Sequence, residues 1–231
     1  MTEIELRDPP CRVRVRTRAN ARRFTLRLDA GGDGAVLTQP PGIGRSETRA
    51  FLEEHAGWLR AALERVPSVV TVGPGARIPV EGRPVVVEVA PGPRRAPILE
   101  DTRLLLRGEG NESRRIAKWL KLRARNRLAP AAEGYAAQLG RRVARVSLRD
   151  TRSRWGSCTS QGALSFSWRL AMAPLEVQDY VAAHEAAHLV EMNHSPRFWA
   201  KVDQLMPDWK RHRDWLRRQG RELHRYRFDT D

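Results

Sequence analysis

The sequence predicts an α+β protein in which a β-rich N-terminal region with one helix, about residues 1–110, precedes a mainly helical region, about residues 111–231. Before residue 110, apolar and polar residues alternate in short runs, which is typical of half-buried strands. From residue 111 onward, apolar residues recur every three to four positions, as they do on one face of a helix. Two further strand-like runs between residues 143 and 170 predict a small antiparallel sheet within the helical region.

The first 66 residues contain three expected strands and one expected helix. Residues 11–16, 24–28 and 35–38 alternate in strand fashion, and the glycine-rich run 31–34 predicts the hairpin turn before the last of them. Ser46 can cap a helix that extends to about residue 66, with Glu47 and Glu53 near its positive end. Pro67 is expected to end it.

The stretch from residue 68 to residue 107 returns to short strands, expected at 69–72, 85–89 and 104–106. Glycine and proline pairs separate them. A long helix follows, with Ile116, Leu120, Ala124 and Leu128 on one face. Pro130 is expected to kink or divide this helix, because proline lacks the N–H that the helix would use.

The C-terminal part predicts two strands followed by three helices. The strands are expected at 143–148 and 163–170, on either side of the run 152–158. Pro174 is placed at a helix start, where its missing N–H costs nothing. Ser195 predicts the N-cap of the next helix, and Asp208 that of the last, which Gly220 is expected to end as a left-handed residue.

Composition sets outer bounds on what the protein does. A chain of 231 residues with 41% hydrophobic residues can bury a substantial core. It shows no secretory signal and no apolar run of membrane-spanning length. Only two cysteines are present, Cys11 and Cys158, which predicts reduced thiols and a cytoplasmic location. The formal net charge of +15 is spread along the chain and allows a nucleotide or nucleic-acid partner.

The run His184-Glu-Ala-Ala-His188 carries the chemistry. Residues four apart lie on one face of a helix, so both histidines can reach one metal ion. Glu185 follows His184 directly but does not lie in line with the two histidines on the helix surface. It can therefore activate a metal-bound water without displacing a ligand. His194 lies six residues after His188, which is the offset of the third ligand in the extended zincin motif. The spacing predicts one Zn²⁺ per chain, held by His184, His188 and His194.

One position departs from the long form of that motif. Glu191 stands where the motif has glycine, three residues after the second histidine. Asn193 is then expected to take the left-handed conformation that ends the helix and returns His194 to the metal.

Several blocks of this sequence resemble the YgjP-like metallopeptidase domain family, which is related to zincin families such as SprT and WLM. They are Arg154-Trp-Gly-Ser-Cys158, Trp168-Arg-Leu170, Ala173-Pro174, Asp179-Tyr180, His184-Glu-Ala-Ala-His188, Met192-Asn-His194-Ser195 and Phe198-Trp199. The resemblance spans about residues 12 to 225. It implies a zincin-like catalytic domain after the β-rich region, zinc on the three histidines, and Glu185 as the catalytic base.

A zincin also needs a group that stabilises the oxyanion of the transition state. The candidates for this role or for substrate binding are Arg154, Tyr180 and Ser157, and Tyr180 is equally well explained as a core residue. By analogy with zincins, the strand expected from residue 163 to residue 168 is a candidate to pair with an extended substrate. Cys158 is interpreted as a structural residue rather than a nucleophile.

Three functions compete on the sequence. The first is a zinc peptidase that acts on a peptide or protein. The second is a metal-dependent hydrolase of a nucleoside triphosphate, which the arginines would suit, although neither a phosphate-binding glycine loop nor a carboxylate cluster for Mg²⁺ is found. The third is a nucleic-acid-associated protease of the SprT kind, with basic faces at 114–127 and 210–227. No membrane partner is expected, and the sequence sets no oligomeric state.

Overall fold

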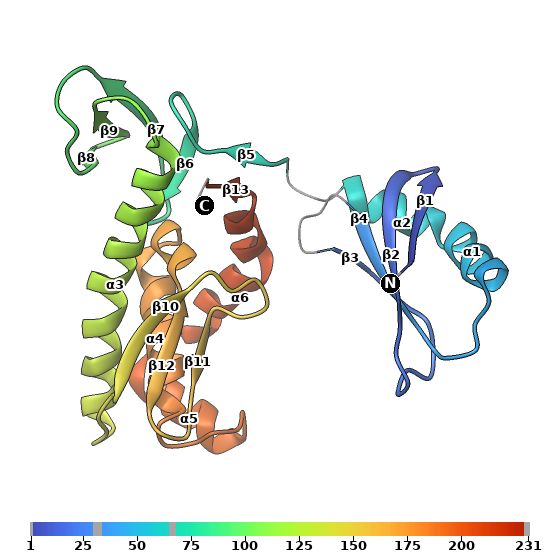
Figure 1. Ribbon diagram of the computed structural model, residues 1–231. Helices are drawn as coiled ribbons and strands as arrows, with labels where there is room; N and C mark the ends of the chain where they lie inside the picture. The colour runs from blue at the N-terminus through green and yellow to red at the C-terminus, as the bar shows by residue number, and fades with distance from the viewer. Residues whose placement is uncertain (1, 30–33, 65–67, 229–231) are drawn as a thin grey trace. The chain divides into compact units, whose positions relative to one another are not determined.

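The computed structural model describes residues 2–29, 34–64 and 68–228. It divides the chain into two compact units, Met1–Ser68 and Val69–Asp231, shown in Figure 1. The fold class is α+β, with an N-terminal strand-rich region and small sheets, as the sequence predicts. Among the described residues, no helix combines the length and the apolar character that crossing a membrane requires.

The N-terminal unit is a four-stranded sheet with two helices. The strand order is β1-β2-β4-β3; β2 and β4 are parallel, and the other neighbours are antiparallel. The elements are β1 (Thr2–Arg7), β2 (Pro10–Thr17), β3 (Thr25–Leu28), β4 (Gly34–Gln39), α1 (Arg45–Glu54) and α2 (Ala56–Glu64). The fully buried side chains of Val13, Leu37, Leu52 and Leu59 form its core. The antiparallel β3–β4 pair agrees with the expected hairpin, whose turn at 31–33 lies outside the described residues.

The helix expected from residue 46 to residue 66 is two helices. They break at His55, which caps α1 with a non-helical backbone (φ −97°, ψ 10°). The N-cap is Gly44 rather than Ser46, and no side chain caps the helix. The expected end near residue 66 lies outside the described residues.

The C-terminal unit begins with strands that belong to the core of the helical region. The four-stranded sheet β6-β7-β9-β8 consists of β6 (Arg77–Val80), β7 (Arg83–Ala90), β8 (Ile98–Glu100) and β9 (Arg103–Arg107). Its buried residues, among them Ile78, Val85 and Leu104, share one hydrophobic cluster with Ile116 and Leu120. The compact units therefore divide at Ser68/Val69 rather than near residue 110, because the second group of strands shares its hydrophobic core with the helices.

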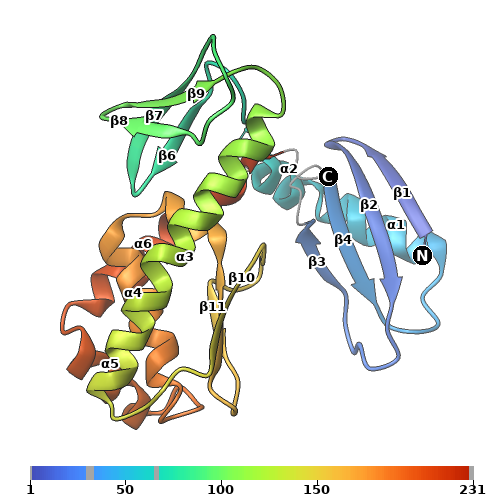
Figure 2. The same cartoon turned by 60° about the vertical axis from the view of Figure 1, so that its left-hand side comes forward.

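The helix α3 (Glu112–Gln138) runs along α4 (Leu175–Ala187), as Figure 2 shows. Its buried stripe includes Ile116, Leu120, Ala124, Leu128 and Ala132. Pro130 does not divide it, contrary to expectation. Pro130 itself is exposed, and the buried residues on either side of it pack as one continuous face, which offsets the lost hydrogen bond.

The small sheet has the order β10-β12-β11. It consists of β10 (Arg145–Arg149), β11 (Gly156–Cys158) and β12 (Ala163–Ser167). It is mixed rather than antiparallel, because β10 and β12 run in the same direction and only β11 is reversed. The strand expected to reach residue 170 ends at Ser167 and continues as the 3₁₀ turn η1 (Trp168–Met172).

The last part of the chain forms α5 (Pro196–Leu205), α6 (Trp209–Gln219) and the 3₁₀ turn η2 (Gly220–His224). The strand β13 (Tyr226–Arg227) then pairs in parallel with β5 (Val70–Thr71). Gly220 is helical (φ −57°) and not the left-handed residue that the sequence suggested. Glycine at this position leaves room for the Trp155 ring, because an added Cβ at Gly220 would lie 3.0 Å from Cζ2 of Trp155.

Candidate metal centre

The helix α4 of the C-terminal unit carries the first two predicted metal ligands and the predicted base. It follows Pro174, as predicted, and its residues Val177, Tyr180, Val181 and Ala186 are buried on several sides. A helix that is apolar nearly all round is a buried helix. The rigid packing of α4 therefore fixes where His184, Glu185 and His188 project.

The structure brings the three predicted histidines together. One ring nitrogen from each histidine lies within 4.8 Å of those of the other two, and Nε2 of His184 is 3.1 Å from Nε2 of His194. Ligand atoms about 2.05 Å from a tetrahedral zinc are separated by roughly 3.3 Å. The His184–His194 spacing thus fits two corners of such a site.

In two of the three histidines, one ring nitrogen has a partner that orients the ring. Nδ1 of His188 lies 3.0 Å from the carbonyl oxygen of Glu191, so that nitrogen carries the proton and Nε2 is left for the metal. Nδ1 of His184 lies 3.5 Å from the hydroxyl of Tyr180. That hydroxyl contacts the nitrogen that does not face His194, which supports an orienting role for Tyr180.

Burial favours the neutral form of two of the three histidines, His184 and His188. Burial, followed by the neighbouring His188 and His194, lowers the pKa of His184 to about 3. Burial also lowers the pKa of His188. Neutral imidazole is the form that binds a metal, and three histidines are a donor set that fits a divalent cation of the zinc type.

His194 reaches the cluster from a short loop after α4. Asn193 does not have the positive φ that was expected; its side-chain oxygen instead accepts a hydrogen bond from the backbone N–H of Ser195 at 3.1 Å. Ser195 caps α5 as predicted, accepting from the N–H of Phe198. The α4 helix already ends at Ala187, with His188 as its C-cap, so a left-handed residue at 193 is not required.

Phe198 is a supporting residue whose role the sequence analysis did not identify. It is fully buried, and its ring centroid lies 4.8 Å from that of His184, 4.4 Å from that of His188 and 4.7 Å from that of His194. One aromatic side chain thus packs against all three histidines and limits their rotation. Its position three residues after the N-cap Ser195 was the available signal.

Glu185 lies beside the histidines with only 4% of its surface exposed. Its Oε2 has no hydrogen-bond partner among the described residues. Burial raises the pKa of this carboxyl to about 8, and Arg154 opposes the shift. A buried polar atom without a partner is costly in an ordinary core, which is consistent with a group that serves a bound water or substrate.

The run 154–158 has glycine at position 156 because this residue lies against Glu185. An added Cβ would lie 2.6 Å from Cγ and 2.7 Å from Cδ of Glu185, and closer still to Oε1. The backbone of β11 therefore rests directly on the Glu185 side chain. Only glycine leaves room for this approach.

The other residues of that run have contacts of their own. The carbonyl of Arg154 accepts a hydrogen bond from the hydroxyl of Thr151, and the Arg154 side chain is exposed. Ser157 pairs with Ser165 across β11 and β12. Burial and then Glu185 raise the pKa of Cys158 to about 11, so this thiol is not a nucleophile at neutral pH.

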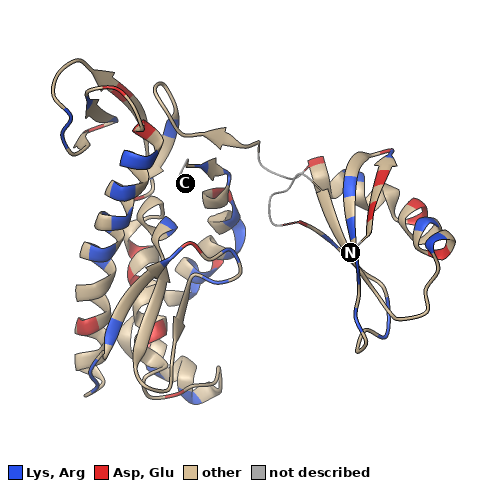
Figure 3. Ribbon diagram, in the orientation of Figure 1, with Lys and Arg blue, Asp and Glu red and all other residues tan. Residues whose placement is uncertain are grey.

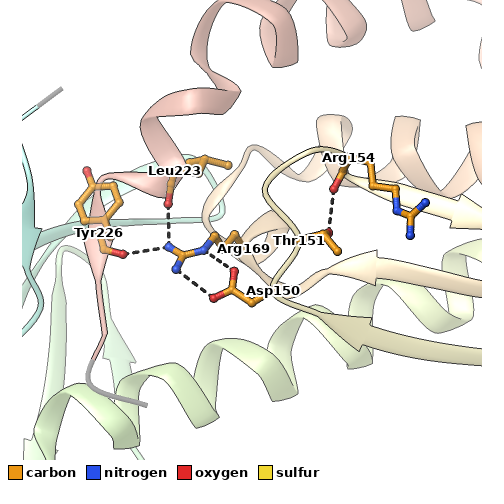
Figure 4. Close-up of polar contacts among 6 residues, drawn as sticks. All are labelled: Asp150, Thr151, Arg154, Arg169, Leu223 and Tyr226. Atoms are coloured by element: carbon orange, nitrogen blue, oxygen red, sulfur yellow. Dashed lines mark hydrogen bonds and ion pairs between the residues drawn. The ribbon is translucent and has the colours of Figure 1, made fainter. Parts of the chain in front are cut away.

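A buried arginine anchors the loop that carries Arg154. Figure 4 shows the Arg169 guanidinium joined to Asp150 and to the carbonyls of Leu223 and Tyr226. The Nε–Oδ1 distance to Asp150 is 2.7 Å. These contacts tie the start of the 150–155 loop to the chain end that follows α6.

A cleft of about 650 Å³ opens beside His184 and Glu185. Arg152, Ser153 and Trp155 of the 150–155 loop line it together with Gly156, and Tyr180 lines it as well. Arginines of α6 and η2 also line it, so part of the basic segment 210–227 faces the cleft. The other basic segment, 114–127, lies on α3 and does not line this cleft.

The edge of the small sheet next to the cleft is β11, not the strand expected to pair with substrate. β12 is flanked by β10 and β11, so both of its edges are occupied. Ser167 N–H donates to the carbonyl of Trp155, and Thr159 N–H donates to that of Ala163. By alternation, the backbone groups of Gly156 and Cys158 point away from β12.

Comparisons with known proteins point to one family. The family model described as the YgjP-like, metallopeptidase domain matches residues 22–219. No curated protein matches the sequence. One solved structure that is similar is the crystal structure of the metallopeptidase zymogen of Pyrococcus abyssi abylysin, with 22% identity, 43% of this chain and 97% of that chain covered, and a TM-score of 0.37. Because the family model covers most of the chain, the protein belongs to the YgjP-like metallopeptidase domain family.

Proposed function

We propose that this protein is a zinc-dependent peptidase that cleaves peptide or protein substrates. The observation that carries the proposal is the buried Glu185 side chain, whose Oε2 has no hydrogen-bond partner among the described residues, next to three convergent histidines. A site with three histidine ligands and an open position is typical of catalytic rather than structural zinc. One zinc ion per chain, on His184, His188 and His194, is the proposed occupancy.

Zinc bound there would supply a Lewis acid that polarises the scissile carbonyl and lowers the pKa of the attacking water. In the proposed mechanism Glu185 accepts the proton of that water and returns it to the leaving nitrogen. The carboxylate form of Glu185, whose pKa burial alone raises to about 8, would be favoured by a dication held on the three histidines.

The remaining residues would hold the substrate. Gly156 and Cys158 present outward-facing backbone groups at the β11 edge, which an extended peptide can use as a strand partner. Tyr180 would orient His184, and Arg154 would lie near the mouth of the site and favour the ionised form of Glu185. The proposed location is the cytoplasm, where Cys11 and Cys158, both free thiols, stay reduced.

A second candidate is hydrolysis of a nucleoside triphosphate. The arginines of the cleft wall favour it, because a guanidinium binds phosphate as readily as carboxylate. The same metal, base and cleft would serve both reactions, so the two candidate functions are distinguished by which substrate the protein hydrolyses.

The test begins with the protein purified without a histidine tag and the Glu185→Gln variant. Metal content is measured by mass spectrometry, and hydrolysis is measured on a panel of peptides and nucleotides. The expected result is about one zinc per chain in both proteins and peptide hydrolysis only in the wild type. Glu176→Gln is the matched control, since this exposed carboxylate lies on the first turn of the same helix.

Each alternative result has a definite meaning. If neither protein holds zinc or takes it up, the proposed metal centre is wrong. If Glu185→Gln retains full hydrolysis, Glu185 is not the base. Hydrolysis of nucleotides and of no peptide would establish the second candidate instead.

A further inference from the structure

Arginine side chains lie in both of the hollows that flank the three histidines. The first hollow is the cleft beside His184, and the second, of about 310 Å³, is lined by His188 and by the turn 159–162. Glu185 is the only acidic residue among those that line the two. The arginines are Arg152, Arg213, Arg217 and Arg221 in the first hollow, and Arg141 and Arg142 in the second.

The two hollows lie along one path. His184 lines the first and His188 the second, and their ring centroids are 5.0 Å apart. Gly156, at the start of β11, lines the first hollow, and the turn that follows β11 lines the second. An extended chain laid along the β11 edge would therefore run from one hollow, past the histidines, into the other.

Three of the arginines that line the first hollow lie on one face of the α6–η2 segment. Arg213, Arg217 and Arg221 are spaced four residues apart on α6 and η2, so they project in similar directions. Figure 3 shows basic residues along this part of the chain. Among the described residues, no carboxylate forms an ion pair with any of these three.

Arg213 is the most constrained of them. Its guanidinium carbon lies 5.3 Å from the ring centroid of Trp199 and 4.9 Å from that of Trp209. Its Nε is buried and has no hydrogen-bond partner among the described residues. The charge contributes to lowering the pKa of His184, which places it close to the proposed metal centre. Stacking on two tryptophans fixes this positive charge in the cleft rather than leaving it in bulk water.

We propose that the cleft selects peptide segments that carry acidic side chains on both sides of the scissile bond. The inference rests on the proposed peptidase function and adds its substrate class. Arginine binds a carboxylate with two parallel N–H···O bonds, which makes it well suited to Asp and Glu. Basic groups at both ends of a path along a strand edge match an extended acidic chain better than a nucleotide, whose phosphates would occupy one hollow.

The test uses quenched fluorogenic peptides that are identical except for a pair of Glu or Gln residues on one side of the central bond. With the zinc-loaded wild type, we expect kcat/KM to be about tenfold higher for Glu than for Gln on either side. Raising the salt from about 50 mM to about 500 mM should shrink this preference, because solvent-exposed charges are screened. The double variant R217Q/R221Q should lose the preference on one side only, and R141Q/R142Q on the other side only.

Arg218→Gln is the matched control, since Arg218 is an exposed arginine of the same helix that does not line the cleft. A binding measurement separates this inference from the peptidase proposal. The Glu185→Gln protein should bind a fluorescent Glu peptide about tenfold more tightly than its Gln counterpart, and R217Q/R221Q added to it should abolish the difference.

The outcomes are distinct. If no peptide is hydrolysed but the Glu preference in binding depends on these arginines, the peptidase proposal fails and the acidic-peptide site stands. If Glu and Gln peptides are cleaved and bound equally well, the inference is wrong although the peptidase proposal survives. If inorganic tripolyphosphate binds through these arginines and the acidic peptide does not, the wall recognises phosphate and the inference is overturned.

Discussion

Gly156→Ala tests whether the close approach of β11 to Glu185 positions the proposed base. Gly156 lies in a strand and does not have a positive φ, so the backbone itself accepts alanine. The conflict is with Glu185, whose Cγ and Cδ would lie 2.6 Å and 2.7 Å from the new Cβ. Ordinary contact begins at about 3.4 Å, so the carboxylate or the strand must move by about 0.8 Å.

A displacement of this size is expected to cost more activity than stability. Misplacing a reacting group by about 1 Å lowers the rate by roughly a hundredfold, whereas overpacking destabilises by about 1–3 kcal/mol. We therefore expect kcat on the best peptide substrate to fall about a hundredfold while bound zinc stays near one per chain. Zinc content, steady-state kinetics and urea denaturation together separate these effects.

Gly134→Ala provides the matched control. Gly134 lies inside α3, and an added Cβ there meets nothing within 4 Å. The same substitution should leave kcat unchanged and stabilise the protein by about 0.5–1 kcal/mol, because alanine favours the helix. A Gly156→Ala enzyme with wild-type kcat would refute the reasoning, since Glu185 would then not depend on the β11 backbone for its position.

Two further predictions concern the support of the cleft. Arg169→Met should lower the free energy of unfolding by about 2–3 kcal/mol, because it leaves two carbonyls and Asp150 without their partner; the half-exposed Asp150 keeps the loss below that of a fully buried pair. Denaturant titration measures this loss, and Arg149→Met, at an exposed arginine, serves as the control. Equal losses in the two variants would contradict the anchoring role of Arg169. Burial lowers the pKa of His224, which stacks on Trp155, from 6.5 to about 4. The unfolded chain then binds the proton more readily, so this contribution to stability is lost as pH falls from about 6.5 toward 4. In His224→Phe the difference in unfolding free energy between pH 7 and about pH 4.5 should be smaller than in the wild type, and an unchanged difference would show that His224 does not titrate in this way.

The expected ligands and base follow from local spacing, which is why the sequence alone could name them. His184 and His188 share a helix face by periodicity, and Glu185 is fixed relative to them within one helical turn. The family assignment rests on the same local blocks, and the family model over residues 22–219 confirms it.

Other features depend on which segments pack together, and periodicity does not specify that. The strands at 70–107 resemble those of the first sheet in pattern, yet they pack on α3 and belong to the second unit. Pro130 was expected to interrupt α3 from its local chemistry, but a continuous buried face holds the helix in one piece. The mixed order β10-β12-β11 assigns the free edge to β11, and a strand's neighbours cannot be deduced from its own residues.

The sequence by itself predicted the α+β class, the convergence of the three histidines and the helix starts at Pro174 and Ser195, because each depends on neighbours within about one turn of chain. Only the tertiary structure placed Phe198 against all three rings, laid Gly156 on Glu185 and turned Arg213, Arg217 and Arg221 into the cleft. These contacts join segments far apart in sequence. Packing of whole elements creates them, and packing is a property of the folded core rather than of any local pattern.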